Sequence, residues 1–270
     1  MKLLKKLSAL FPLLIYTIIW APVFMLVIFS FSNNRFGVKW EGFTLRWYVE
    51  LFTNSTIKDA LYTSLIIAAV TVVVSTIAGT LLAYGMYKYK FRGKEALRVT
   101  VLMPMVMPSI VTGAALLVFF SRILQLPLGY VSIIIAHITF STPLAMFVVL
   151  GRMARIDWSL EEASADLGAS RLTTWRKITL PVLFPAMITS AAMIFPWSFD
   201  DVVITYFVAG VGTTTLPIYV FSQLRYGTTP VINTIGTIFV MFPIIGVLLV
   251  TLLQKKAKPI ISGDGGEIDE

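Results

Sequence analysis

Residues 62–87 read YTSLIIAAVTVVVSTIAGTLLAYGMY, a long apolar run without a single charged side chain. About 20 apolar residues in a helix are enough to cross the hydrocarbon core of a bilayer, so this run predicts a transmembrane helix. Five further windows have the same character, at residues 9–31, 99–121, 127–151, 183–208 and 231–253. The whole chain is 57% hydrophobic and 13% charged, with a mean hydropathy of +0.84. We therefore predict an all-α, polytopic membrane protein with six transmembrane helices.

The charged residues between these windows predict the orientation of the chain. Basic side chains concentrate in the N-terminal segment, in the 88–98 loop, in the 152–182 loop and after the last window. The segments on the other side hold fewer cations, namely Arg35, Lys39, Arg46, Lys58, Arg122 and Arg225. Because cytoplasmic loops are enriched in Lys and Arg, both termini are expected in the cytoplasm. The net charge of +8 is then a signal of topology, and we expect no nucleic-acid partner.

The composition excludes several kinds of catalytic site. It contains no cysteine, a single histidine at His137 and no Gly-rich phosphate-binding loop. We therefore predict a transport subunit rather than an enzyme, with no cofactor of its own. The predicted organisation is one transmembrane domain over residues 1–258, which includes a long cytoplasmic loop at 152–182. An acidic, Gly-rich tail at 259–270 is predicted to be disordered.

The cytoplasmic loop has a helical pattern of its own. Residues 157–181 read DWSLEEASADLGASRLTTWRKITLP. Ser159 is placed as an N-cap with Glu162 three residues later, which predicts a capping box at the start of a helix. Gly168 predicts a turn, and a second helical segment is expected to end before Pro181. The apolar side chains of this helical hairpin are Leu160, Leu167, Leu172 and Trp175. They predict either a surface hairpin without further role or a docking face for another subunit.

The spacing within this loop makes the second interpretation specific. Glu162-Ala163-Ser164 is followed after three residues by Gly168, and after nine more by Ile178-Thr179-Leu180-Pro181. This arrangement resembles the EAA signature of ABC-importer permeases, with Ser164 in place of the usual second alanine. In that family the loop forms coupling helices that insert into a groove on a separate ATPase subunit. The resemblance therefore implies that the ATPase binds ATP and Mg²⁺, and that it meets the residues Glu162, Ala163, Ser164, Gly168, Ile178, Leu180 and Pro181.

Other stretches extend the resemblance over most of residues 25–245. They are FSNNRFGVKWEGF at 31–43, YKYKFRGK at 87–94, HITF at 137–140 and SFDDVVITYFVAG at 198–210. They are similar to the spermidine/putrescine permease subfamily, and within it to the C-subunit type. The resemblance implies a type I ABC importer-like fold in the bacterial cytoplasmic (inner) membrane. It also implies a second permease subunit, an ATPase dimer and an extracytoplasmic polyamine-binding protein as partners, besides the membrane lipid.

Two adjacent acids, Asp200 and Asp201, fall inside the fifth predicted window. A charge at the bilayer centre costs at least about 2.5–3.5 kcal/mol, so an ionisable residue there indicates a functional site. Trp197 shares a helix face with both acids, and an aromatic ring attracts an ammonium by roughly 2 kcal/mol when desolvated. We hypothesise that Asp200 and Asp201, with Trp197 and Tyr206, line the path of a polyamine. Which of the two acids faces the lumen is left open, because adjacent residues on a helix point about 100° apart.

Other interpretations of the acid pair also fit the sequence. One aspartate could pair with a cation of the sister subunit, or the pair could relay protons in a secondary carrier. His137 could line the path or hydrogen-bond to a neighbouring helix. Pro104, Pro108 and Pro143 are interpreted as kinks that shape a cavity.

Two positions outside the fifth window are further candidates for the substrate path. Ser109, which follows Pro108, could offer its hydroxyl to the lumen. Trp47, like Trp40, could contact the ligand or a docked binding protein, or could anchor the chain at the membrane interface. The sequence does not distinguish between these roles.

Together these patterns predict the transmembrane permease subunit of an ATP-driven importer for polyamines, which forms the translocation path with a second permease. An ABC permease for another cationic or organic solute is the alternative within the same class. A proton-coupled secondary carrier is the alternative from a different class. The preference between spermidine and putrescine is not encoded in any feature that we recognise.

Overall fold

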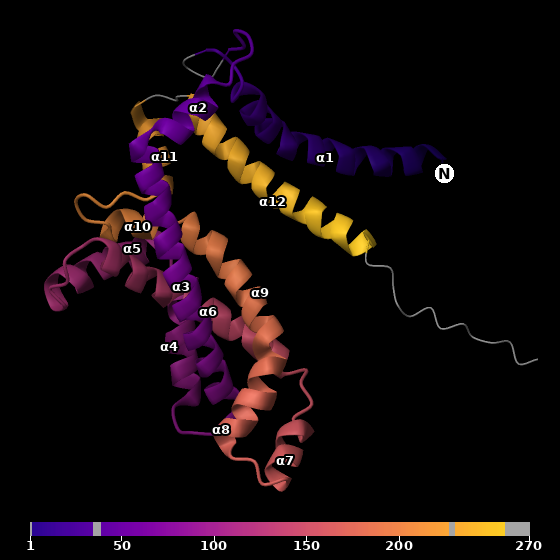
Figure 1. The fold of residues 1–270 in the computed structure, drawn as a ribbon, viewed down its shortest axis with the longest axis vertical. Coiled ribbons are helices and arrows are strands. Elements are labelled where there is room, and N and C mark those ends of the chain that lie inside the picture. Colours follow the sequence, from indigo (N-terminus) through magenta and orange to yellow (C-terminus); the bar gives the residue numbers. More distant parts are fainter. Residues whose placement is uncertain (1, 35–38, 227–229, 257–270) are drawn as a thin grey trace, which may run out of the picture. The chain divides into compact units, whose positions relative to one another are not determined.

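The computed structural model describes residues 2–34, 39–226 and 230–256 (Figure 1). Within these ranges the regular structure is helical, apart from one isolated antiparallel bridge between Ser32 and Phe43. The chain forms two compact units, residues 1–54 with 223–270 and residues 55–222. The predicted acidic tail at 259–270 lies outside the described residues.

The larger unit holds most of the helices. In chain order they are α3 (Ser55–Lys88), α4 (Lys94–Val106), α5 (Ser109–Val118), the π-helical turn η1 (Phe119–Ile123), α6 (Tyr130–Met153), α7 (Ser159–Asp166), α8 (Arg171–Thr174), the π-helical turn η2 (Trp175–Thr179), α9 (Leu180–Phe199), α10 (Val203–Val208) and α11 (Leu216–Tyr226). The smaller unit contains α1 (Lys2–Phe29), α2 (Arg46–Thr53) and α12 (Pro230–Lys256). The last residues of α11 belong to the smaller unit.

The core of the larger unit is the packing of α3, α6 and α9 against one another. At Gly79 in α3, an added Cβ would lie only 2.7 Å from the backbone nitrogen of Met146 in α6. Small residues let the helices approach this closely, and Ala68, Ala83 and Ala145 are fully buried. Such packing is typical of helices in a membrane, where apolar burial against lipid offers no driving force of its own.

The number of membrane crossings is only partly established by these helices. Among the described residues, three segments are long and apolar enough to cross a membrane, namely Ser55–Lys88, Tyr130–Met153 and Arg171–Phe199. A fourth crossing results if the bent pair of α4 and α5 with η1 counts as one span. The shorter apolar segments Leu14–Phe29 and Pro230–Met241 fall within or across the first and last predicted windows. The count of six crossings therefore stays a prediction.

The third predicted window, 99–121, is not one straight helix. The chain bends by 108° between Lys94–Val106 and Ser109–Ile123. Proline disfavours helical backbone in the residue before it, and Met107 accordingly has extended angles of φ −73° and ψ 143° before Pro108. The predicted kink at Pro108 is thus a sharp break, whereas Pro104 and Pro143 lie inside α4 and α6.

The prediction of one continuous helix over the fifth window, 183–208, is wrong. The helix α9 ends at Phe199, and α10 begins at Val203 after a short break. The carboxylate of Asp201 accepts hydrogen bonds from the backbone N–H and the hydroxyl of Thr205, both at 2.8 Å. A side-chain acceptor for the free N–H groups of a helix start favours a new helix at this point. The carboxylate of Asp201 therefore favours the start of α10 after the break.

The smaller unit is organised around an aromatic cluster. The ring of Phe31 stacks on Phe43 and on Tyr48, with centroid distances of 5.5 and 5.1 Å. The indole nitrogen of Trp47 donates to the carbonyl of Ser32 at 2.8 Å, and the side chain of Trp47 is buried. These contacts attach α2 to the segment that follows α1.

Candidate functional site

The two acids of the fifth window lie in the break between α9 and α10, and the structure separates their environments. Asp200 is exposed, whereas the side chain of Asp201 is only 12% exposed. The two neighbours are therefore not equivalent. One carboxylate is engaged inside the larger unit, and the other is available to a molecule outside it.

Asp201 belongs to a buried polar network that joins α6, α9 and α10. The Nδ1 atom of His137 lies 2.8 Å from the hydroxyl oxygen of Ser198, and its Nε2 atom lies 2.9 Å from that of Thr205. His137 Nε2 is also 3.6 Å from Asp201 Oδ2. The other members of this network, His137, Ser198 and Thr205, are buried. The prediction that His137 hydrogen-bonds to a neighbouring helix is confirmed.

The direction of these hydrogen bonds follows from the number of protons available. Because the Thr205 hydroxyl donates to Asp201, its oxygen is left to accept from His137 Nε2–H. With the proton on Nε2, the Nδ1 atom accepts from the Ser198 hydroxyl. Each ring nitrogen of His137 thus has a hydroxyl partner. A fully paired network of this kind is the form in which buried polar groups are tolerated.

The other predicted path residues of the larger unit present exposed surface. Trp197 is 45% exposed and Tyr206 is 61% exposed, and Ser109 is exposed at the first turn of α5. The helices α5 and α10 lie side by side (Figure 1), and a Cβ added at Gly113 would come within 2.6 Å of the Phe207 ring. The structure thus presents Asp200, Trp197, Tyr206 and Ser109 at the surface of α5, α10 and the end of α9.

Trp47 belongs to the smaller unit and is only 6% exposed. Its indole N–H is already used by the Ser32 carbonyl. Trp47 thus packs inside the smaller unit, and both predicted roles, contact with a ligand or binding protein and anchoring at the membrane interface, stay predictions. Trp40, by contrast, is 49% exposed.

The 152–182 loop, which we predict to be cytoplasmic, forms the predicted hairpin of two helices. Figure 1 shows α7 and α8 together at one end of the larger unit. Gly168 has φ +79°, a left-handed conformation that favours glycine, and the turn predicted there is confirmed. Leu160, Leu167 and Leu172 are exposed, as expected for a docking face, and Trp175 is half-buried.

Two details of this hairpin differ from the sequence prediction. The capping box is wrong, because Ser159 is already the first helical residue and Asp157 Oδ1 accepts its N–H at 3.0 Å. That hydrogen bond lowers the pKa of the Asp157 carboxyl. The second arm also does not end before Pro181 but continues into α9, so that Arg171–Phe199 is one helical segment. The proline, which lacks an N–H, is accommodated by the adjacent π-helical turn η2.

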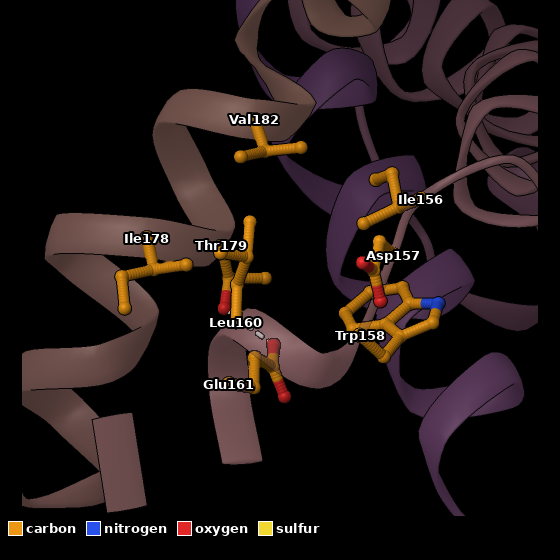
Figure 2. Close-up of a pocket in the computed structure, with 8 residues that line it drawn as sticks. All are labelled: Ile156, Asp157, Trp158, Leu160, Glu161, Ile178, Thr179 and Val182. Atoms are coloured by element: carbon orange, nitrogen blue, oxygen red, sulfur yellow. Dashed lines mark hydrogen bonds between the residues drawn. The ribbon is translucent and has the colours of Figure 1, made fainter. Parts of the chain in front are cut away.

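The residues of the EAA-like signature have distinct environments. Glu162, Ala163 and Pro181 are exposed, and Leu180 is half-buried. Ser164, the departure from the family pattern, lies 2.9 Å from the Thr174 hydroxyl, so that a hydrogen bond links the two arms. Ile178 lines a crevice at the base of the hairpin with Ile156, Asp157, Trp158, Leu160, Glu161, Thr179 and Val182 (Figure 2).

Sequence reasoning missed the acid next to Glu162. Glu161 is buried, its Oε2 atom lies 2.5 Å from Lys88 Nζ, and its Oε1 atom accepts from the Thr179 hydroxyl, as Figure 2 shows. Lys88 Nζ also lies 5.1 Å from the ring centroid of Trp158. The available signal was the doublet itself, since adjacent helical residues point about 100° apart and only one of them can face outward.

Comparison with known proteins agrees with this fold and this hairpin. The family model described as "binding-protein-dependent transport system inner membrane component" matches residues 75–259. The chain belongs to this family, and it is a multi-pass membrane protein of the ABC importer permease type. A chain in the crystal structure of a bacterial ABC transporter for the acidic polysaccharide alginate has the same fold, with a TM-score of 0.70 and 19% identity, over 95% of this chain and 98% of that chain.

Curated relatives are more similar in sequence. The spermidine/putrescine transport system permease protein PotC of Haemophilus influenzae is 37% identical over 246 residues, which cover 91% of this chain and 95% of the relative. The putrescine transport system permease protein PotI of Escherichia coli strain K12 is 38% identical over 232 residues, which cover 84% of this chain and 83% of the relative.

Proposed function

We propose that this chain is the permease subunit of an ATP-driven importer that carries polyamines such as spermidine and putrescine. The similarity to PotC and PotI over most of the chain supports a polyamine substrate. The observation that carries the proposal is that Asp200, Trp197 and Tyr206, at and on either side of the break between α9 and α10, are all exposed. A polyamine is a chain of methylenes with ammonium groups, so it requires both an anion and apolar surfaces.

The proposed path residues recognise such a ligand in two ways, through a carboxylate and through aromatic rings. Asp200 neutralises one ammonium group, and in a site of low dielectric this attraction is stronger than in water. The Trp197 and Tyr206 rings cover methylenes or attract a second ammonium through their faces. Ser109, at the start of α5, adds a hydroxyl acceptor to this polar surface. A second permease subunit provides the opposite wall of the path.

The energy comes from a different subunit. We assign ATP and Mg²⁺ to a separate ATPase dimer, because this chain has no phosphate-binding loop. The hairpin of α7 and α8 docks on that ATPase, with Glu162, Leu167 and Gly168 at its exposed end. Closure of the ATPase dimer around ATP displaces the hairpin and opens the path toward a docked binding protein. Hydrolysis then returns the helices to the inward-open arrangement.

The location of the chain follows from its charge pattern. The basic excess in the N-terminal segment, the 88–98 loop and the 152–182 loop supports cytoplasmic termini in a bacterial inner membrane. The binding protein then docks on the outer side. A solved alginate transporter in complex with a periplasmic protein has a chain of the same fold, with a TM-score of 0.67 and 18% identity, and it supports this assembly.

Uptake by the reconstituted complex tests the proposal. The chain, a second permease, the ATPase and the binding protein are placed in proteoliposomes, and the import of radiolabelled spermidine and putrescine is measured with and without ATP. We expect the import to depend on ATP. Unlabelled spermidine and putrescine should each compete with the labelled polyamine, and few other cations should do so. Import of another organic cation in preference to polyamines would contradict the substrate. Import by the chain alone, driven by a proton gradient, would identify a secondary carrier instead.

A further inference from the structure

One short segment at the base of the hairpin contacts the ends of three long helices. Glu161 of α7 pairs with Lys88, the last residue of α3, at 2.5 Å. Glu161 also accepts the Thr179 hydroxyl from the turn that leads into α9. The indole N–H of Trp158 donates to the carbonyl of Met153, the last residue of α6, at 3.2 Å. Figure 2 shows Trp158, Glu161 and Thr179 around this crevice.

The ammonium of Lys88 is held in this place by the Trp158 ring as well as by the acid. Its Nζ atom lies 5.1 Å from the Trp158 ring centroid, and Tyr87 stacks on the same ring with a centroid distance of 5.1 Å. The side chain of Lys88 is 36% exposed and that of Glu161 is 10% exposed. The acid is thus the desolvated member of the pair, and it depends on Lys88 for compensation of its charge.

The physical consequence of such a pair is geometric more than energetic. The free-energy cost of moving a carboxylate out of water nearly cancels the attraction that it gains in the ion pair. A partly buried pair is therefore weak evidence for stability. Its best-attested effect is to fix one register between the elements that it joins. Here the fixed register is that of α7 on the end of α3. Any displacement of the hairpin that preserves the pair must carry the end of α3 with it.

We propose that the Lys88–Glu161 ion pair, supported by Trp158, is a positioning joint that transmits displacement of the hairpin to α3. This inference rests on the proposed function, because it requires an ATPase that moves the hairpin. The helix α9 follows the hairpin through continuous helical backbone from Arg171 to Phe199. No such backbone continuity links α3 to the hairpin, so side chains have to carry the motion there. Neither residue touches the substrate path.

The test measures how many ATP molecules the complete complex hydrolyses for each polyamine imported. In proteoliposomes, Glu161→Gln and Lys88→Met are expected to raise this ratio by roughly twofold to thirtyfold, the range found for residues that transmit coupling. The KM for polyamine stays unchanged, because the path is intact. The charge-swapped double variant, Lys88→Glu with Glu161→Lys, is expected to bring the ratio back toward that of the unmodified complex. A residue with a merely structural role would lower the yield of folded complex but leave this ratio unchanged.

A matched control is available in α4. Glu95 and Arg98 form an exposed ion pair at 3.4 Å within α4, and Glu95→Gln is expected to leave the ratio unchanged. If Glu161→Gln imports polyamine at the unmodified ratio, the joint is refuted although the proposed function stands. If the unmodified complex shows no ATP-dependent polyamine import, the proposed function fails first.

A second variant keeps the inference testable if the single substitutions assemble poorly. The chain has no cysteine, so Lys88→Cys with Glu161→Cys creates a unique thiol pair. A short bifunctional thiol reagent can then hold the joint closed. We expect the cross-linked complex to import polyamine at a normal ratio, because the joint stays closed during the cycle. Arrest of import by the cross-link, but not by the reagent on either single variant, would overturn the inference.

Discussion

The two acid doublets of this chain, Asp200–Asp201 between α9 and α10 and Glu161–Glu162 in α7, are divided in the same way by the structure. In each doublet one carboxylate is buried with partners, and its neighbour is exposed. The partners differ with the surroundings. Asp201 is compensated by a hydroxyl, a backbone N–H and a nearby histidine, whereas Glu161 is paired with an ammonium that is itself partly exposed.

This difference indicates what each buried acid does. At Asp201 the hydrogen bonds favour the start of α10 after the break, and Asp200 is exposed. At Glu161 the ion pair joins separate helices and leaves Glu162 outward. In both places the buried acid positions the chain, and we propose that the exposed acid meets another molecule.

Asp200→Asn is expected to have the largest effect. Removal of the charge loses a charge-assisted contact to an ammonium, which is worth about 1.5–3 kcal/mol, or roughly tenfold to a hundredfold in uptake per unit concentration at low polyamine. The melting temperature is expected to stay the same, since Asp200 is exposed. Radiolabelled uptake and thermal unfolding of the detergent-purified chain measure the two effects. Asp59→Asn, another exposed acid, is the control; equal uptake by both variants would contradict the role of Asp200.

Asp201→Ala is expected to destabilise the chain instead. It removes a helix-start acceptor and leaves buried partners such as Thr205 unpaired, at a combined cost of about 2–3 kcal/mol. Thermal unfolding of the purified variant measures the loss, and Asp201→Asn, which keeps an acceptor oxygen, is expected to lose less. If Asp201→Ala melts like the unmodified chain but abolishes uptake, Asp201 is a ligand and the division of the doublet is wrong.

Gly168→Ala is expected to have a smaller effect, confined to the hairpin. A side chain in the left-handed region costs about 1–2 kcal/mol, and no neighbouring atom lies within 4 Å to add a steric clash. Weaker binding of the separate ATPase measures the effect, because the arms lose their preferred angle. Gly151→Ala in α6 also has open space around the added carbon and serves as the control. Equal ATPase binding by both variants would show that the turn geometry is unimportant.

The smallest effect is expected at the start of α7. The Ser159 N–H holds the pKa of Asp157 below its unfolded value of 3.8, so this carboxylate stabilises the helix start above that pH. The stabilisation is lost as the pH falls through the lower pKa of the folded state. Asp157→Asn is therefore expected to speed hydrogen exchange in the first turn of α7 at neutral pH. The difference from the unmodified chain should vanish at low pH, and a difference that persists there would assign the effect to another cause.

The long apolar helices and the hairpin were predictable, and the breaks and the buried contacts were not. Residues 62–87 and 127–151 are long apolar runs, which favour helices in lipid. The second window agrees closely with α6, whereas α3 begins seven residues before the first window, at Ser55. The spacing from Glu162 through Gly168 to Pro181 likewise located the hairpin. The break after Phe199 was missed because hydropathy does not register a side chain that competes for backbone N–H groups.

The contacts of Glu161 were missed for a different reason. Its partner Lys88 is far away in the sequence, and the pair exists only after α3 and α7 meet. The second arm of the hairpin was ended too early because proline was expected to stop the helix, whereas a π-helical turn accommodates it. Long-range partners and local adjustments of this kind require the folded structure.

Thiol accessibility in the assembled complex tests the division of the doublets most directly. Because the chain has no cysteine, each of Asp200→Cys, Asp201→Cys, Glu161→Cys and Glu162→Cys provides one reactive group. We predict that the thiol at position 200 reacts with a small cationic reagent and is protected by spermidine, and that the thiol at position 162 reacts until the ATPase binds. The thiols at 201 and 161 should react slowly under all conditions. Protection by spermidine at 201 rather than 200, or by the ATPase at 161 rather than 162, would contradict the account.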